Sequence, residues 1–444
     1  MVSIVKNSNS KIIQAFLSFL HSDMAGGVLL FICALLAMII ANSPLSNYYF
    51  EFWHLNFGIT IGDKFIGMSL SHWLNDVFMS IFFLIVGLEI KREFLFGELV
   101  GIKKASFPVL AALGGMIVPA TIFLSLNFGT PSQAGFGIPM ATDIAFALGV
   151  IILLGKMVPV ALKVFLVTLA VADDLGAIIV IGVFYTNGFN ILWFVIALIM
   201  IGILILFNKK DVRILWPYLL IGLFLWLSVY NTGIHATIAA VALAFTIPVR
   251  PKIDGDEFMD KISSSFVPLF IAKDKDRNSI LLDKMQVDVL NSIVRGSKNV
   301  QNPLLRLEHA LAPWSSLLIM PLFGFANAGV AIGSDINFNV DHIFLGVLLG
   351  LVIGKPLGIL SFTFICDKLG FAQKPKNVSW IHILGAGMLA GIGFTMSIFV
   401  SNLAFASNAA NIDLSKLSIL ISSSLAAILG SLFISASYFL SKKN

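Results

Sequence analysis

Long apolar stretches recur along the whole of this 444-residue chain, and each is long enough to cross a lipid bilayer as a helix. A membrane helix needs about 20 apolar residues to span a hydrocarbon core of roughly 30 Å. Hydrophobic residues make up 58% of the chain and charged residues only 12%, whereas about 25% of a soluble protein is charged. Stretches of this length favour helices over the shorter strands of a barrel. We therefore expect an all-α polytopic membrane protein.

We expect about twelve membrane spans, which together form one transport domain over residues 1–444. Their approximate ranges are 15–42, 69–88, 104–127, 138–155, 158–186, 190–208, 214–230, 233–249, 311–333, 342–366, 379–404 and 414–441. Lys and Arg concentrate in alternate connections, at 89–104, 209–213 and 367–376, as in the cytoplasmic loops of membrane proteins. This pattern fits an even number of spans with both termini in the cytoplasm. It also explains the net charge of +5 without a nucleic-acid partner, and no cleavable signal peptide is expected.

Two connections differ from the short loops. Residues 52–70 alternate loosely around Gly62 and Asp63, which is typical of a two-stranded hairpin, and we assign 44–68 to a hairpin outside the membrane. Its exposed edge could pair with a second copy of the chain. Residues 250–306 form a long polar loop between spans eight and nine, on the cytoplasmic side, with a short helix expected near 280–293.

Five ionisable residues lie inside the predicted spans: Asp76, Asp143, Asp173, Asp174 and Lys355. One charge at the centre of a membrane helix costs about 2.5–3.5 kcal/mol, so five unpaired charges would cost on the order of 10 kcal/mol. They could form salt bridges that only hold helices together, or they could line an ion pathway. Asp173 and Asp174 favour the pathway, because neighbours on a helix point about 100° apart and one cation cannot satisfy both equally. Lys355 lies at a similar depth and can face one of them.

Two spans contain sequences typical of broken helices. The first runs from Gly135 through Pro139 to Asp143, and the second contains several glycines between Gly385 and Gly393. Interrupted helices near the bilayer midplane, at corresponding positions of two halves, indicate the ion site of a transporter. Their ends carry partial charges, which Asp143 and Lys355 could balance. The glycines could instead serve only close helix packing, which would not explain Asp143.

Several motifs together resemble the NhaA family of bacterial sodium/proton antiporters. They are ATDIAFALG (141–149), ADDLGAIIV (172–180), GIHATIAA (233–240), LEHALAPW (307–314), FANAGV (325–330), GKPLGI (354–359) and GIGFTMSIF (391–399). The resemblance covers nearly the whole chain and implies inverted repeats, with two interrupted helices that cross near the midplane. It implies electrogenic, pH-regulated export of sodium, and also of lithium, in exchange for more than one proton each. It also implies a bacterial inner-membrane protein and a homodimer through the hairpin. Segment 250–304 is longer than in typical members.

The resemblance also assigns an ion site. Asp173 and Asp174 would bind Na⁺, with Thr142 nearby. Asp143 and Lys355 would balance the broken helices, and Lys355 could also pair with Asp173. Sodium is a hard cation that favours oxygen ligands, and protons bind the same oxygens. Competition at a site that opens to one side at a time would produce exchange.

A second set of residues corresponds to the family's cytoplasmic pH-sensing cluster: Glu89, Glu93, Glu308 and His309, with His235 as a further candidate towards the outside. A histidine found in this cluster in some relatives is Ala312 here, which puts the pH profile in question. Glu89 and Glu93 lie at a helix end, where they could simply be solvated. A lone histidine such as His235 could serve only packing.

The expected partners are Na⁺ or Li⁺, protons and the lipid bilayer. We expect that the protein is not an enzyme and that it needs no cofactor. Three other classes stay open. A sodium-coupled symporter of an organic solute shares the midplane site and broken helices, but few polar groups beyond Asn327 are available to recognise a solute. An intramembrane aspartyl protease needs two aspartates that face each other, whereas Asp173 and Asp174 are consecutive. A channel requires weaker binding than five buried charges favour.

Overall fold

The computed structural model describes residues 24–62, 64–186, 188–260, 262–263, 284–331, 341–375 and 378–441. Its α-helices are α2 (Met24–Ala41), α3 (Ser46–His54), α4 (Leu70–His72), α5 (Met79–Phe96), α6 (Ile102–Asn127), α7 (Ile144–Leu154), α8 (Val160–Phe184), α9 (Ile191–Lys209), α10 (Leu215–Thr232), α11 (Thr237–Thr246), α13 (Lys284–Val300), α14 (Pro303–Trp314), α15 (Met320–Asn327), α16 (His342–Leu349), α17 (Lys355–Lys368), α18 (Trp380–Ala390), α19 (Phe394–Ala404) and α20 (Ala409–Ser441). Two 3₁₀ segments, η2 (Pro131–Met140) and η3 (Gly155–Met157), and three π-helical turns, η1 (Trp73–Phe78), η4 (Ser315–Ile319) and η5 (Gly350–Gly354), extend or join them.

Nine helical segments of the described chain are long and apolar enough to cross a membrane. The pairs α2 with α3 and α18 with α19 pass the same test together, although they are bent by 115° and 47°. Helix α11 is a shorter apolar helix. If each bent pair and α11 make one crossing, the described residues supply the expected number of about twelve. The protein is therefore an all-α polytopic membrane protein.

Some element boundaries differ from the sequence predictions. Within the range assigned to the hairpin, Ser46–His54 forms helix α3, and the two antiparallel strands are β1 (Asn56–Ile61) and β2 (Lys64–Ser69). The span predicted at 311–333 instead begins at Pro303 and reaches Asn327. Its first turns carry Arg, Glu and His, which lower the hydropathy of this stretch, so hydropathy alone does not reveal the helix. The short helix expected at 280–293 is α13, and the first part of that range lies outside the described residues.

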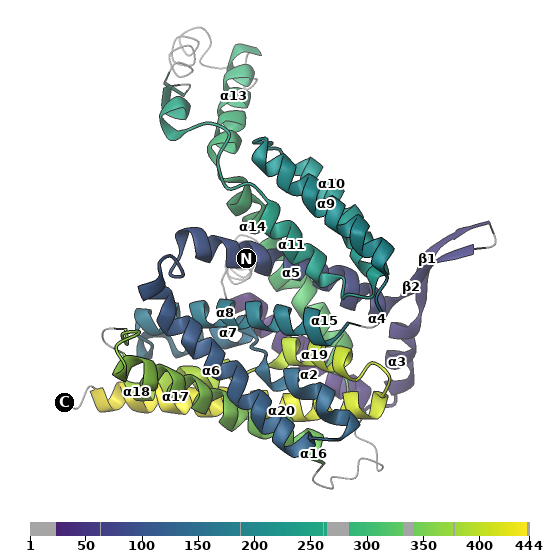
Figure 1. The fold of residues 1–444 in the computed structure, drawn as a ribbon, viewed down its shortest axis with the longest axis vertical. Helices are drawn as coiled ribbons and strands as arrows, with labels where there is room; N and C mark the ends of the chain where they lie inside the picture. The colour runs from purple at the N-terminus through teal and green to yellow at the C-terminus, as the bar shows by residue number, and fades with distance from the viewer. Residues whose placement is uncertain are drawn as a thin grey trace, which may run out of the picture.

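Figure 1 shows the helices gathered in one bundle, from which three parts stand out. Helices α9 and α10 pack against each other along one edge, and the strands β1 and β2 extend away from the bundle. Helix α13 projects beyond the start of α14. Apolar side chains on α9 and α10 are extensively exposed, among them Leu192, Ile199 and Leu223. A large exposed apolar surface on a membrane protein is the surface that meets lipid.

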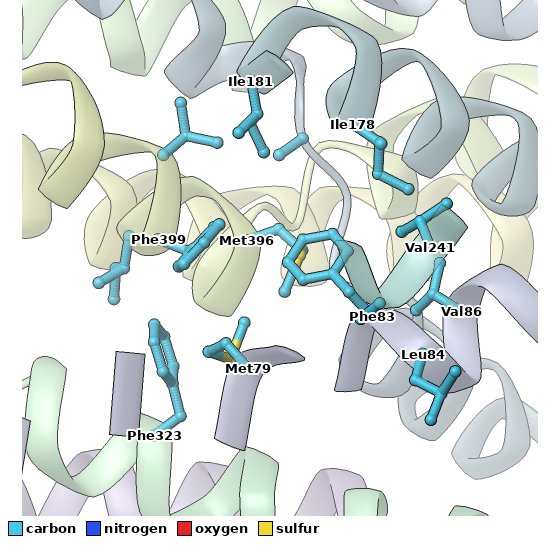
Figure 2. Packing of buried hydrophobic residues seen from close by; sticks show 14 of the residues in the cluster. Met79, Phe83, Leu84, Val86, Ile178, Ile181, Val241, Phe323, Met396 and Phe399 are labelled. Atoms are coloured by element: carbon cyan, nitrogen blue, oxygen red, sulfur yellow. The ribbon is translucent and has the colours of Figure 1, made fainter. Parts of the chain in front are cut away.

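The interior of the bundle is filled by aromatic and aliphatic side chains from helices far apart in the sequence. Figure 2 shows Met79 of α5 close to Phe323 of α15, and Phe83 of α5 on the side of Phe399 and Met396 of α19. The rings of Phe83 and Phe399 lie 5.5 Å apart, and those of Phe323 and Phe399 lie 6.4 Å apart. All five side chains are buried. This packing holds α5 against the broken span that contains α19.

Helices α6 and α17 cross at a pair of glycines. A methyl group at Gly358 would overlap the carbonyl oxygen of Gly114, and a methyl group at Gly114 would overlap the carbonyl oxygen of Gly358. Small residues at such contacts let two membrane helices approach closely. Lys355 begins α17 and Gly358 lies on its first turn, so this contact fixes the position of the lysine.

We expect Gly358→Ala to lower stability by about 1–3 kcal/mol, because the added methyl group forces α6 and α17 apart. The measurement is the melting temperature of the purified protein in detergent. Gly202→Ala in α9 is the matched control, because nothing lies within 4 Å of the added carbon there. Equal melting temperatures for the two variants would contradict the close contact.

Candidate functional site

The two interrupted spans meet at their breaks. The first break lies between Met140, which ends η2, and the start of α7, and the second lies between Ala390, which ends α18, and the start of α19. The backbone N–H of Asp143 donates to the carbonyl of Ile392 at 2.7 Å. The hydroxyl of Thr142 lies 3.0 Å from the carbonyl oxygen of Ala390. The two breaks are thus joined directly.

The carboxylate of Asp143 serves two helix N-termini. One oxygen accepts the backbone N–H of Phe146 in the first turn of α7, at 3.0 Å. The other oxygen accepts the backbone N–H and the hydroxyl of Thr395 at the start of α19, at 3.2 and 2.7 Å. Free N–H groups give a helix N-terminus a partial positive charge. Asp143 is fully buried and lies where its negative charge balances both ends.

The ammonium of Lys355 lies against the opposite kind of helix end. Its ammonium donates to the carbonyl of Met140, at the C-terminal end of η2, where the partial charge is negative. It also forms an ion pair with Asp173, with 2.6 Å between Nζ and Oδ2. The same oxygen of Asp173 accepts the hydroxyl of Thr142 at 2.6 Å. Lys355, Asp173 and Thr142 are all buried, so the lysine charge is neutralised inside the bundle.

One buried carboxylate oxygen of this pair has no partner in the part of the chain that the structure describes, and a second buried carboxylate lies next to it. Oδ1 of Asp173 is buried and has no hydrogen-bond partner among the described residues. The neighbouring Asp174 is also buried, and the charges of Asp173, Lys355, Asp143 and Glu89 act on it. Buried polar atoms without a partner are rare in proteins. Oxygens of this kind suit a small hard cation, which would enter as substrate. The described residues hold no group of three His, Cys, Asp or Glu side chains suited to a resident metal.

A second polar cluster joins the end of α5 to α14. Arg92 forms an ion pair with Glu308, and its guanidinium lies 3.2 Å from Glu93. Glu89 interacts electrostatically with all three of these residues. His309 follows Glu308 but is exposed. The structure thus brings the three predicted carboxylates together around an arginine, with the histidine at the edge.

The residue next to this arginine connects α5 to a further helix. Lys91 is buried and donates to the carbonyls of Phe245 and Ile247, at 2.6 and 2.5 Å, at the C-terminal end of α11. A cation at a helix C-terminus is stabilising. The end of α5 therefore holds both α11 and α14.

His235 lies apart from that cluster. Its Nε2 is 3.6 Å from Asp76 on η1, and its Nδ1 is 2.9 Å from the hydroxyl of Thr237. Its ring also packs edge-on against Phe399, with 5.2 Å between the centroids. Asp76 is half-buried, and among the described residues its charged neighbours are His235 and His72 and not the carboxylates near Lys355.

Sequence reasoning missed three groups of the site. Thr395 binds Asp143, Met140 contributes only its carbonyl, and Arg92 organises the cluster at the end of α5. Thr395 could have been found, because it follows the glycines of the second break. A backbone carbonyl has no signal in the side-chain sequence, so the role of Met140 depends on the three-dimensional crossing.

Comparisons with known proteins show the family of the chain. The family model described as Na+/H+ antiporter 1 matches residues 17–434. The chain belongs to this family of antiporters. It is 57% identical to the Na(+)/H(+) antiporter NhaA of Wolinella succinogenes over 429 residues, which cover 97% of this chain and 94% of the relative. It is also 57% identical to Na(+)/H(+) antiporter NhaA 2 of Helicobacter hepaticus and 54% identical to a Helicobacter pylori antiporter, with 97% of both chains covered in each case.

We expect Thr395→Val to destabilise this antiporter by about 1.5–3 kcal/mol, because it removes a hydrogen bond to a buried carboxylate. The melting temperature in detergent measures the change. Thr363→Val is the matched control, because the buried Thr363 hydroxyl bonds only carbonyls of its own helix, Ile359 and Leu360. The role given to Asp143 at the crossing would be wrong if both variants melted at the same temperature.

Proposed function

We propose that this antiporter exports sodium, and also lithium, in electrogenic exchange for protons that compete for Asp173 and Asp174. The observation that carries the proposal is the pair of adjacent buried carboxylates, one of which is held by Lys355 and leaves an oxygen free. Sodium and protons both bind such oxygens. Occupancy by one therefore excludes the other, and the two ions exchange.

The charge at the site supports a ratio above one proton per sodium. In the proton-loaded state, Asp174 carries a proton and the Lys355–Asp173 ion pair is neutral, so the site has no net charge. Sodium needs both carboxylates, and its arrival displaces the proton of Asp174. Sodium also competes with the Lys355 ammonium for Asp173. When that ion pair separates, Lys355 releases a second proton. The sodium-loaded site then carries one negative charge, which makes the exchange electrogenic.

Access to the site would alternate by movement of the broken spans against the rest of the bundle. The proton gradient drives sodium out when the protein lies in the bacterial inner membrane with both termini in the cytoplasm, as the alternation of basic loops favours.

The exposed apolar side chains of Phe57 and Ile59 on β1 support pairing of the hairpin with a second copy.

Asp174→Asn should abolish sodium-induced collapse of a pH gradient in proteoliposomes, because an amide cannot bind and release the exchanged proton. The fold should survive, since Asp174 forms no ion pair among the described residues. Asp413→Asn serves as the control, because Asp413 lies on α20 at an exposed position away from the crossing. Exchange retained by Asp174→Asn would overturn the assignment of the site.

We further propose that the cluster around Arg92 regulates the pH dependence of exchange. Glu308 leaves its second oxygen buried and unpartnered, so a change in its protonation alters the link between α5 and α14. Electrostatic interactions connect Glu308 to Glu89, and Glu89 to Asp174. This chain of charges joins the cluster to the ion site.

Glu308→Gln should shift the activation of exchange to higher pH while the maximal rate is kept, because a neutral amide mimics the protonated, low-pH carboxylate. The measurement is the exchange rate in proteoliposomes from mildly acidic to alkaline pH. Glu98→Gln removes a charge from an exposed residue in the connection after α5 and should leave the profile unchanged. An unshifted profile for Glu308→Gln would exclude this carboxylate as the sensor.

A further inference from the structure

A small basic cavity lies where segment 250–306 rejoins the helical bundle. Its volume is about 110 Å³, and its walls come from the connection before α10, the residues after α11, the end of α13 and the start of α14. Four of its lining residues are basic: Arg213, Lys252, Lys298 and Arg306. None of the lining residues that the structure describes is acidic. The cavity is therefore a concentration of positive charge that the exchange mechanism does not use.

Hydrogen bonds fix the walls of this cavity to one another. The backbone N–H of Lys252 donates to the carbonyl of Asn299 at 2.8 Å, and the guanidinium of Arg306 donates to the carbonyl of Lys298 at 3.1 Å. The guanidinium of Arg213 donates to the carbonyl of Pro251. The four cations are therefore held close together by the fold, in spite of their mutual repulsion.

Only part of this charge is neutralised within the described chain. Arg213 pairs with the exposed Asp211, with 2.9 Å between Nε and Oδ1, and its hydrogen bonds hold the pKa of Asp211 below its usual value. Asp254 also acts electrostatically on Arg213. By contrast, the ammonium groups of Lys252 and Lys298 form no ion pair with any described residue. These two lysines and Arg306 remain available to an anion.

We propose that this cavity binds a phosphate group, supplied by the headgroup of an anionic lipid or by a soluble phosphate compound. Its volume of about 110 Å³ leaves room for a small anionic group such as a phosphate. Lysine and arginine donors suit the several oxygens of a phosphate.

The position of the cavity permits both sources. The exposed Ile214 and Trp216 lie at the start of α10, where an aromatic side chain next to basic residues is typical of a membrane surface. Arg306 and Glu308 lie on the same turn of α14, so the bound phosphate would hold the helix that also carries the predicted pH-sensing carboxylate.

The test compares the wild-type protein with the double variant Lys252→Gln/Lys298→Gln in two arms. In the first, inorganic phosphate is titrated into protein in detergent at constant ionic strength, and the melting temperature is recorded. In the second, the protein is placed in phosphatidylcholine nanodiscs with or without phosphatidylglycerol. Lys209→Gln/Lys210→Gln is the control, because it removes the same charge from lysines that do not line the cavity.

We expect stabilisation of the wild type and the control, and an affinity roughly tenfold or more weaker in the cavity variant. Stabilisation by inorganic phosphate identifies a soluble anion as a source, and stabilisation only by phosphatidylglycerol identifies the lipid headgroup. Lys252→Arg/Lys298→Arg should restore the response in either case. The proposal is overturned if neither ligand stabilises the wild type, or if the cavity variant responds as the control does.

Discussion

A lysine ammonium can be buried inside a membrane protein only if its charge is neutralised, and this constraint on Lys355 organises the centre of the bundle. The ammonium is neutralised by Asp173 and donates a further hydrogen bond to the carbonyl of Met140. Both partners are within reach only because α17 packs closely on α6 at Gly358, and because the turn before it packs closely on η2. A methyl group at Gly350 of that turn would lie 2.6 Å from a side-chain atom of Pro139. Close packing of glycines thus serves an electrostatic requirement.

The two broken spans meet a related constraint, because the partial charges at their exposed helix ends need neighbours of opposite charge. Breaking a helix inside a membrane exposes N–H and carbonyl groups that water cannot reach, and each exposed end needs a partner. Asp143 accepts from the N-termini of α7 and α19, and Lys355 donates to the end of η2. Thr142 has a single hydroxyl proton but lies within hydrogen-bond distance of both Asp173 and Ala390. It can serve only one of these acceptors at a time, so the ion site and the end of α18 share one proton donor.

The sequence predicted the parts of this arrangement that depend on composition and depth. The apolar spans, the two breaks and a contact between Lys355 and one of the two adjacent aspartates follow from apolar length, from glycines and from charges at one depth. The choice of Asp173 came from the family resemblance. The roles of these residues in transport stay predictions. What the sequence could not predict depends on tertiary contacts. The start of α14 at Pro303 was missed because charged residues in its first turns lower its hydropathy, although one of them, Glu308, pairs with Arg92 in the fold. The π-helical turn before Lys355 has no local signal, because its glycines fit many backbone conformations.

The most direct test of the account is the number of protons released when sodium binds to the purified protein, measured in weakly buffered solution by titration with sodium at several pH values. If sodium and protons compete for Asp173 and Asp174 and sodium also separates Asp173 from Lys355, each bound sodium releases more than one proton, and sodium affinity rises with pH. Sodium binding that releases no protons and has the same affinity at every pH would contradict competition at these carboxylates.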